Sequence, residues 1–198
     1  MAAQDTGDTP GLEFDGLKLI GEENARYLVS KIRTIPDFPG KGVMFRDVMP
    51  ILTDAKAFGL LINAMVEALP ISASEFDYIG GLEARGFLVG VPLACKLKKG
   101  FLPIRKLGKL PPPTLKQSYE LEYGAATIEI EDKLLPQGSH VLIVDDLMAT
   151  GGTATAAKKL VERTGSTVVG FSFAVELEGQ GGRERLGDDP ISVLMRMS

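Results

Sequence analysis

The stretch from residue 141 to residue 175 most constrains what this chain can fold into. Val141 to Val144 are four apolar residues in succession, a run typical of a strand buried on both faces of a parallel sheet. A loop of small residues follows, apolar residues then recur at helical spacing as far as Gly165, and residues 168–175 form a second apolar run. Strand, helix and strand in this order predict a βαβ unit, and therefore an α/β fold.

Two acids and a glycine loop lie between the first predicted strand and the helix. In open α/β sheets, ligands bind beyond the carboxyl ends of the strands. Glycines let the backbone approach a ligand closely, and the free amides at a helix N-terminus favour a phosphate. Ionised carboxylates accept hydrogen bonds, which suits the hydroxyls of a ribose. The pattern therefore predicts a site for ribose 5-phosphate, formed by Asp145, Asp146, Ala149, Thr150, Gly151, Gly152 and Thr153.

The commoner phosphate loops do not fit this segment. A Walker loop needs a lysine directly after its glycines, and none follows Gly152. A dinucleotide fold places its acid about 20 residues after the glycines, whereas Asp145 and Asp146 come before them.

Composition excludes several other classes. The chain has 198 residues and a formal net charge of −4, which favours one domain and disfavours nucleic acid as a partner. One cysteine, Cys95, and one histidine, His140, provide neither an intrachain disulfide nor a zinc cage, and we assign neither residue a role. We expect no membrane span and, because residues 1–16 lack the pattern of a secretory signal, a cytoplasmic protein.

Further patterns outline the rest of the chain. We expect residues 1–24 to form a flexible arm, because they are rich in Asp, Gly and Thr. Apolar spacing from Ala25 to Ile35 predicts a helix that ends before Pro36, and Asp54 is a candidate N-cap of a second helix. Residues 106–118, with three prolines, are typical of a loop, and alternation over 127–131 predicts a strand.

Several segments together resemble a known family. The pattern over 141–153 is similar to the phosphoribosyl diphosphate motif of type I phosphoribosyltransferases. Four more segments stand in the order found in the adenine phosphoribosyltransferases and extend the resemblance across residues 25–198: Phe38-Pro39 with Gly42–Asp47, Gly81–Phe87, Ile104–Pro111 and Ser118–Gly124.

The resemblance implies a fold and a reaction. It implies a five-stranded, mostly parallel core sheet flanked by helices in a single domain over 25–198. A small hood would comprise residues 25–50 and the C-terminal segment, and a mobile lid would span 105–123. The implied reaction converts adenine and 5-phospho-α-D-ribose 1-diphosphate to AMP and diphosphate in purine salvage, with Mg²⁺ held by substrate oxygens and water. It also implies a homodimer and a non-proline cis peptide at Glu83-Ala84.

The same resemblance assigns roles to individual residues. The diphosphate would be bound by Glu83, Ala84, Arg85, Arg105, Lys106 and Lys109, and the adenine by Met44, Phe45, Arg46 and Leu147. Catalysis would use Glu122 as acid or base, together with Arg85 and Lys109, while Tyr123 would shape the lid. Leu107 and Pro112 depart from the usual basic residue and glycine of the lid, which affects its charge and motion.

Two other hypotheses remain at this point. The chain could transfer ribose 5-phosphate to another base, such as hypoxanthine, guanine, xanthine, uracil or orotate; the Phe45-Arg46-Asp47 segment and Glu122 argue against this. It could instead be a non-catalytic regulator that senses phosphoribosyl diphosphate, which the acidic charge and the retained basic lid disfavour.

Overall fold

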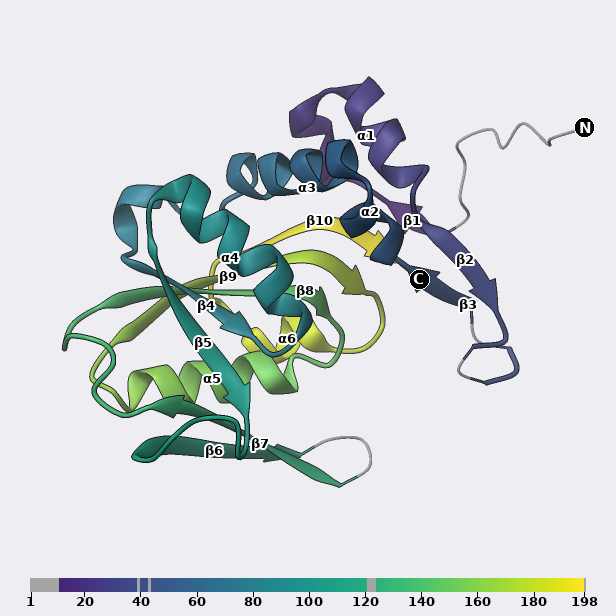
Figure 1. The fold of residues 1–198 in the computed structure, drawn as a ribbon. Coiled ribbons are helices and arrows are strands. Elements are labelled where there is room, and N and C mark those ends of the chain that lie inside the picture. Colours follow the sequence, from purple (N-terminus) through teal and green to yellow (C-terminus); the bar gives the residue numbers. More distant parts are fainter. Residues whose placement is uncertain (1–10, 39, 43, 121–123, 198) are drawn as a thin grey trace, which may run out of the picture.

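The computed structural model describes residues 11–38, 40–42, 44–120 and 124–197. Its main sheet has eight strands in the order β1-β10-β9-β8-β4-β5-β7-β6, and β2 and β3 form a separate two-stranded sheet (Figure 1). The strands are β1 (Leu12–Glu13), β2 (Arg33–Pro36), β3 (Met44–Asp47), β4 (Tyr78–Leu82), β5 (Gly100–Lys106), β6 (Thr114–Glu120), β7 (Ala125–Glu131), β8 (His140–Met148), β9 (Thr167–Leu177) and β10 (Ile191–Met197).

Five neighbouring strands form the parallel core that the resemblance implies. β10, β9, β8, β4 and β5 pair in parallel, while β1, β7 and β6 add antiparallel strands at the edges. The apolar run at 141–144 lies in the middle of this core and is fully buried. The predicted βαβ unit is confirmed as β8, α5 and β9.

Helices cover both faces of the sheet (Figure 1). Leu142 and Val144 of β8 belong to a core with α1, α3 and α4, whereas Val141 and Ile143 face α5. This division follows from the alternation of side chains along a strand. The helices are η1 (Asp15–Ile20), α1 (Glu22–Val29), α2 (Met49–Thr53), α3 (Ala55–Glu67), η2 (Ala73–Glu75), α4 (Arg85–Leu97), α5 (Gly152–Glu162) and α6 (Gly182–Leu186). No helix in the described ranges is long and apolar enough to span a membrane.

The N-terminal prediction is wrong for the described residues from 11 to 24. β1 pairs with β10, η1 follows it, and Leu17 is 0% exposed. A Cβ on Gly16 would lie 2.7 Å from the Leu194 Cα, so the chain runs directly against β10. The scattered apolar residues of this segment are stabilised by a tertiary contact that composition does not show. Residues 1–10 lie outside the described residues.

Three further boundaries differ from expectation. The helix predicted over 25–35 ends at Val29, and β2 takes up the next apolar residues by pairing with β3. The predicted hood therefore contains a hairpin, whereas the C-terminal residues 191–197 are β10 of the main sheet. Residues 114–118 of the loop predicted over 106–118 are strand, because β6 pairs with β7 from Thr114 to Glu120. The predicted N-cap of the second helix is confirmed: Asp54 accepts a hydrogen bond from the Ala57 amide at 2.9 Å.

Candidate active site

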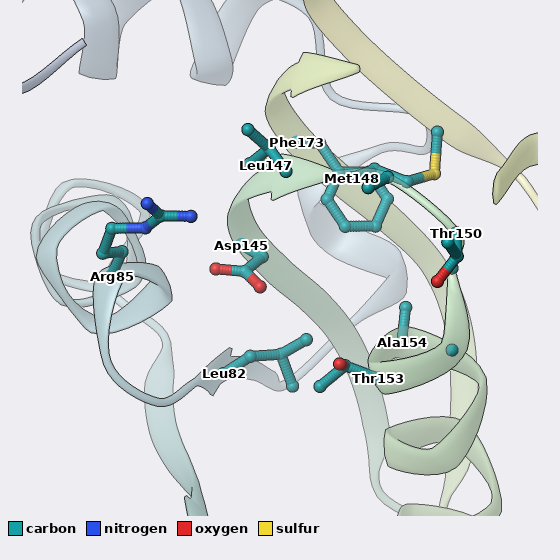
Figure 2. Close-up of a pocket in the computed structure, with 12 residues that line it drawn as sticks. Leu82, Arg85, Asp145, Leu147, Met148, Thr150, Thr153, Ala154 and Phe173 are labelled. Atoms are coloured by element: carbon teal, nitrogen blue, oxygen red, sulfur yellow. The ribbon is translucent and has the colours of Figure 1, made fainter. Parts of the chain in front are cut away.

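A cavity of about 220 Å³ opens where β4 ends and β8 continues. β4 pairs with β8 only as far as Val144, but β8 stays paired with β9 through Met148. Asp145 and Asp146 therefore lie within β8 rather than after it, a correction to the predicted strand end. Twelve residues line the cavity (Figure 2): Leu82, Arg85, Asp145, Leu147, Met148, Ala149, Thr150, Gly151, Gly152, Thr153, Ala154 and Phe173.

The predicted phosphate loop forms one wall of this cavity. Gly151 is the N-cap of α5 and has φ +72°, a backbone conformation that favours glycine. Its carbonyl accepts from the Thr155 amide, so the helix begins directly beneath the loop. The hydroxyl-bearing residues Thr150 and Thr153 lie at this same end of α5 (Figure 2). The amides at the start of α5 therefore border a pocket of suitable size for an anion.

A second glycine segment supports this loop from behind, which the sequence analysis missed. A Cβ on Gly182 would lie 2.2 Å from the Ala149 carbonyl oxygen, and one on Gly151 would lie 2.8 Å from the Gly182 carbonyl oxygen. Arg183 holds the start of α6 against β9 by donating to the Glu176 carboxylate at 2.7 and 3.3 Å. The glycines at 179, 181 and 182 are the sequence pattern from which this contact could have been suspected.

The two acids have different surroundings. The Asp146 carboxylate pairs with the Arg85 guanidinium at 2.8 Å, whereas Asp145 faces the cavity opposite Arg85 (Figure 2). Burial, followed by the neighbouring Asp146 charge, raises the pKa of Asp145 well above its usual range. Gly86 permits this arrangement, because a Cβ there would lie 2.8 Å from Asp145 Oδ1.

The predicted diphosphate residues form a cluster beside the cavity. Glu83 accepts from Arg105 Nε and Nη2 at 3.3 and 3.1 Å and from the Lys106 amide at 2.8 Å. The Arg105 contact is the largest influence that lowers the pKa of Glu83. The Glu83-Ala84 peptide is cis, as the resemblance implies, and α4 begins at Arg85.

Comparisons with known proteins agree with this geometry. A family model described as the phosphoribosyl transferase domain matches residues 51–193. An adenine phosphoribosyltransferase of Bifidobacterium adolescentis is 55% identical over 100% of this chain and 99% of its own length. The crystal structure of adenine phosphoribosyltransferase from Thermoanaerobacter pseudethanolicus has a TM-score of 0.81 at 47% identity, covering 86% of this chain and 98% of that one.

A second similar structure carries ligands. It is the adenine phosphoribosyltransferase of Saccharomyces cerevisiae, complexed with adenine and D-2,5-dideoxy-2,5-imino-altritol 1,6-bisphosphate. Its TM-score is 0.78 at 41% identity, over 87% of this chain and 98% of that one. This chain belongs to the adenine phosphoribosyltransferases, a branch of the phosphoribosyltransferase family.

For an adenine phosphoribosyltransferase, most of the residues predicted to bind the base do not line the cavity. Leu147 lines it, but Met44, Phe45 and Arg46 lie on β3 of the small sheet and do not. The Phe45 ring packs edge-on against Phe38 at 5.1 Å between centroids, and Arg46 donates to the Thr34 hydroxyl. Their contact with a base stays a prediction, as does the role of Glu122 and Tyr123, which lie outside the described residues.

Two contacts of the lid region were not predicted. Thr153 of the phosphate loop donates to the Tyr119 hydroxyl at 3.1 Å, so β6 is tied to the start of α5. Glu129 of β7 is buried and accepts hydrogen bonds from the loop that carries Lys109. The sequence predicts a loop over 106–118, and nothing local in the sequence indicates these partners.

Proposed function

We propose that this chain transfers the 5-phosphoribosyl group from 5-phospho-α-D-ribose 1-diphosphate to adenine, giving AMP and diphosphate. The observation that carries this proposal is the cavity itself. It brings the glycine loop at the start of α5, Asp145 and Arg85 around one space, in a chain 55% identical to an adenine phosphoribosyltransferase. Asp146 lies next to this space and pairs with Arg85. Purine salvage, the recovery of a free base as a nucleotide, follows from this reaction.

The glycine loop and the acids would hold the sugar. Amides of the residues from Ala149 to Thr153 suit the 5-phosphate, because a helix N-terminus favours negative charge. The ribose hydroxyls can donate to the carboxylates of Asp145 and Asp146. The sugar would then lie with its C1 toward Arg85 on the opposite wall.

The reaction exchanges two bonds at C1 of the ribose. Nitrogen N9 of adenine forms a bond to C1, the C1–oxygen bond breaks, and its electron pair leaves with the diphosphate. Positive charge develops on the sugar, as in glycoside hydrolysis, and negative charge grows on the diphosphate. The cationic side chains of Arg85, Arg105, Lys106 and Lys109 would stabilise that charge, beside Glu83 and the Ala84 backbone.

The reaction would use Mg²⁺, for which the residues present provide a partial fit. The described residues contain no group of three or more side chains able to enclose a metal ion. Asp145 nevertheless offers hard carboxylate oxygens at the cavity, which suit Mg²⁺ when substrate oxygens and water complete its shell. When bound, the ion would neutralise charge on the diphosphate.

Residues of the hood and the lid would supply the base side. We assign adenine recognition to Met44, Phe45, Arg46 and Leu147, where an aromatic ring can stack on a purine and backbone groups provide a donor and an acceptor. Glu122 would take the N9 proton or stabilise the ring while the new bond forms, and Tyr123 would shape the lid.

A base panel tests the proposal. Purified protein is mixed with phosphoribosyl diphosphate, Mg²⁺ and, in separate reactions, adenine, hypoxanthine, guanine, xanthine, uracil or orotate, and diphosphate release is measured. We expect adenine to be used at least about 100-fold more efficiently than any other base, since a site that pairs with a polar edge rejects analogues strongly. Turnover with a different base only, or binding of phosphoribosyl diphosphate without any turnover, would contradict it.

We also propose a homodimer. The exposed face of α4 presents Leu88 and Val91, which are 44% and 42% exposed and lie three residues apart on one side of the helix. A second copy of this chain would cover them. Sedimentation velocity is expected to give twice the mass of the chain, and Leu88→Glu is expected to shift the protein to monomer; a monomeric wild type would refute the dimer.

A further inference from the structure

The loop between β5 and β6 is fastened to a buried carboxylate. Glu129 is 2% exposed and lies in the middle of β7. One of its oxygens accepts from the Lys109 amide at 2.9 Å and from the Leu110 amide at 3.1 Å, and the other accepts from the Thr114 hydroxyl at 3.2 Å. Two of these three contacts fall on Lys109 and the residue that follows it.

The other side of the Lys109 backbone is held by Arg105. Arg105 donates to the Lys109 carbonyl at 3.0 Å while it pairs with Glu83. Arg105 and Glu129 are also direct partners in the β5–β7 register. The amide and the carbonyl of Lys109 are therefore both fixed, while its side chain is exposed.

Glu129 bears its charge at this position. Burial is the largest influence and raises the pKa of Glu129, but the hydrogen bonds from the Lys109 and Leu110 amides and from Thr114 outweigh it, and the pKa is lowered overall. A buried carboxylate is costly unless it is fully hydrogen-bonded, so an apolar side chain would serve better for packing alone.

We propose that Glu129 is a positioning residue that sets the backbone from which the Lys109 ammonium reaches the diphosphate of the substrate. This inference rests on the proposed function, because it assigns Glu129 to the same transfer reaction. Glu129 does not touch substrate; it acts through Lys109.

The first test compares Glu129→Gln with Glu131→Gln, an exposed residue two positions along the same strand. The amide keeps the shape but weakens charge-assisted hydrogen bonds to neutral ones. We expect the KM for phosphoribosyl diphosphate to rise about tenfold with Glu129→Gln, with a smaller change in kcat and a KM for adenine within about twofold. Glu131→Gln is expected to match wild type, and equal kinetics for the two variants would overturn the proposal.

A double-mutant cycle separates positioning from simple support of the fold. In a Lys109→Ala background, Glu129→Gln should change the KM for phosphoribosyl diphosphate by less than about twofold, because the group it positions is gone. The same tenfold increase in KM in both backgrounds would show a role independent of Lys109.

A second variant applies if Glu129→Gln does not fold. Thr114→Val removes one hydrogen bond to the Glu129 carboxylate and should raise the KM for phosphoribosyl diphosphate about twofold; no change would count against the proposal. A wild type without adenine turnover would instead refute the proposed function.

Discussion

The two ends of the candidate site are built in different ways. At the phosphate end, the loop from Ala149 to Gly152 is held by backbone packed against backbone, with Gly182 in direct contact. At the diphosphate end, the loop that carries Lys109 is held by two carboxylates, Glu83 and Glu129, through side-chain hydrogen bonds.

This difference indicates what each end is suited to do. Backbone contacts at the limit of close packing leave the phosphate loop little freedom to move. A rigid loop suits the 5-phosphate, because the reaction leaves that group chemically unchanged. Hydrogen bonds between side chains and a loop can break and re-form, which suits a lid that must open for diphosphate to leave. Substitutions that add volume should therefore impair binding at the phosphate end, and substitutions that change charge should impair binding at the diphosphate end.

The largest effect is expected from Gly182→Ala. Its new methyl group would lie 2.2 Å from the Ala149 carbonyl oxygen, and because that atom is backbone, the phosphate loop itself must move. We expect kcat/KM for phosphoribosyl diphosphate to fall by about 100-fold or more and the free energy of unfolding to fall by about 2–3 kcal/mol. Steady-state kinetics and urea unfolding measure the two quantities.

Gly179→Ala is the matched control for that variant. Gly179 lies in the same glycine segment and has φ +74°, but a Cβ there would meet no atom within 4 Å. It should lose about 1 kcal/mol of stability from backbone strain and keep its kinetics. If Gly179→Ala impaired the reaction as much as Gly182→Ala, the contact with Ala149 would not be what supports the loop.

The next effect distinguishes the two acids at the junction of the ends. Burial and the charge of Asp146 raise the pKa of Asp145 in the folded protein. The contribution of Asp145 to the free energy of unfolding is therefore complete below the pKa of the unfolded chain, and it is lost as pH rises through the pKa of the folded protein. Asp145→Asn should therefore unfold like wild type near pH 3 and be more stable than wild type at pH 7. Asp146→Asn should instead lose about 1 kcal/mol at pH 7, because it weakens the 2.8 Å pair with half-exposed Arg85.

Activity provides the counterpart of this stability experiment. Both variants should lose about tenfold or more in kcat/KM for phosphoribosyl diphosphate, because a neutral amide accepts hydrogen bonds from ribose less strongly than a carboxylate. A variant at residue 145 that is both stabilised at pH 7 and less active would show that the site keeps this buried carboxyl group at a cost to folding. Equal stability of Asp145→Asn and wild type across pH would contradict the raised pKa of Asp145.

The two ends also differ in how far the sequence predicts them. The parallel strand at 141–144, the glycine loop and α5 follow from hydrophobic periodicity and glycine placement, which are local properties. The strand β6 and the burial of Glu129 do not, because three prolines and several charges resemble a solvated loop until β7 pairs with it. Alternation over 127–131 predicts a half-buried strand, but it does not predict that the Glu129 carboxylate is buried and binds the loop.

Contacts between distant segments account for the remaining differences. Leu17 is buried because η1 packs against α1, α3 and β10, the last strand of the chain. The support of the phosphate loop by Gly182 joins residues separated by the whole of α5 and β9. Periodicity reports which face of an element is apolar, and it carries no information on which remote backbone that face will meet.

The smallest effect concerns a hydrogen bond that joins the two ends directly. Thr153 of the phosphate loop donates to the hydroxyl of Tyr119 on β6 at 3.1 Å, so Tyr119→Phe removes a single neutral hydrogen bond at a half-buried position. We expect the KM for phosphoribosyl diphosphate to rise about two- to fivefold and the free energy of unfolding to fall by about 1 kcal/mol or less. In a Thr153→Val background, which has already lost the bond, Tyr119→Phe should have almost no further effect. Additive losses in the double variant would mean that Tyr119 and Thr153 act separately, and that the lid hairpin and the phosphate loop are not coupled through this contact.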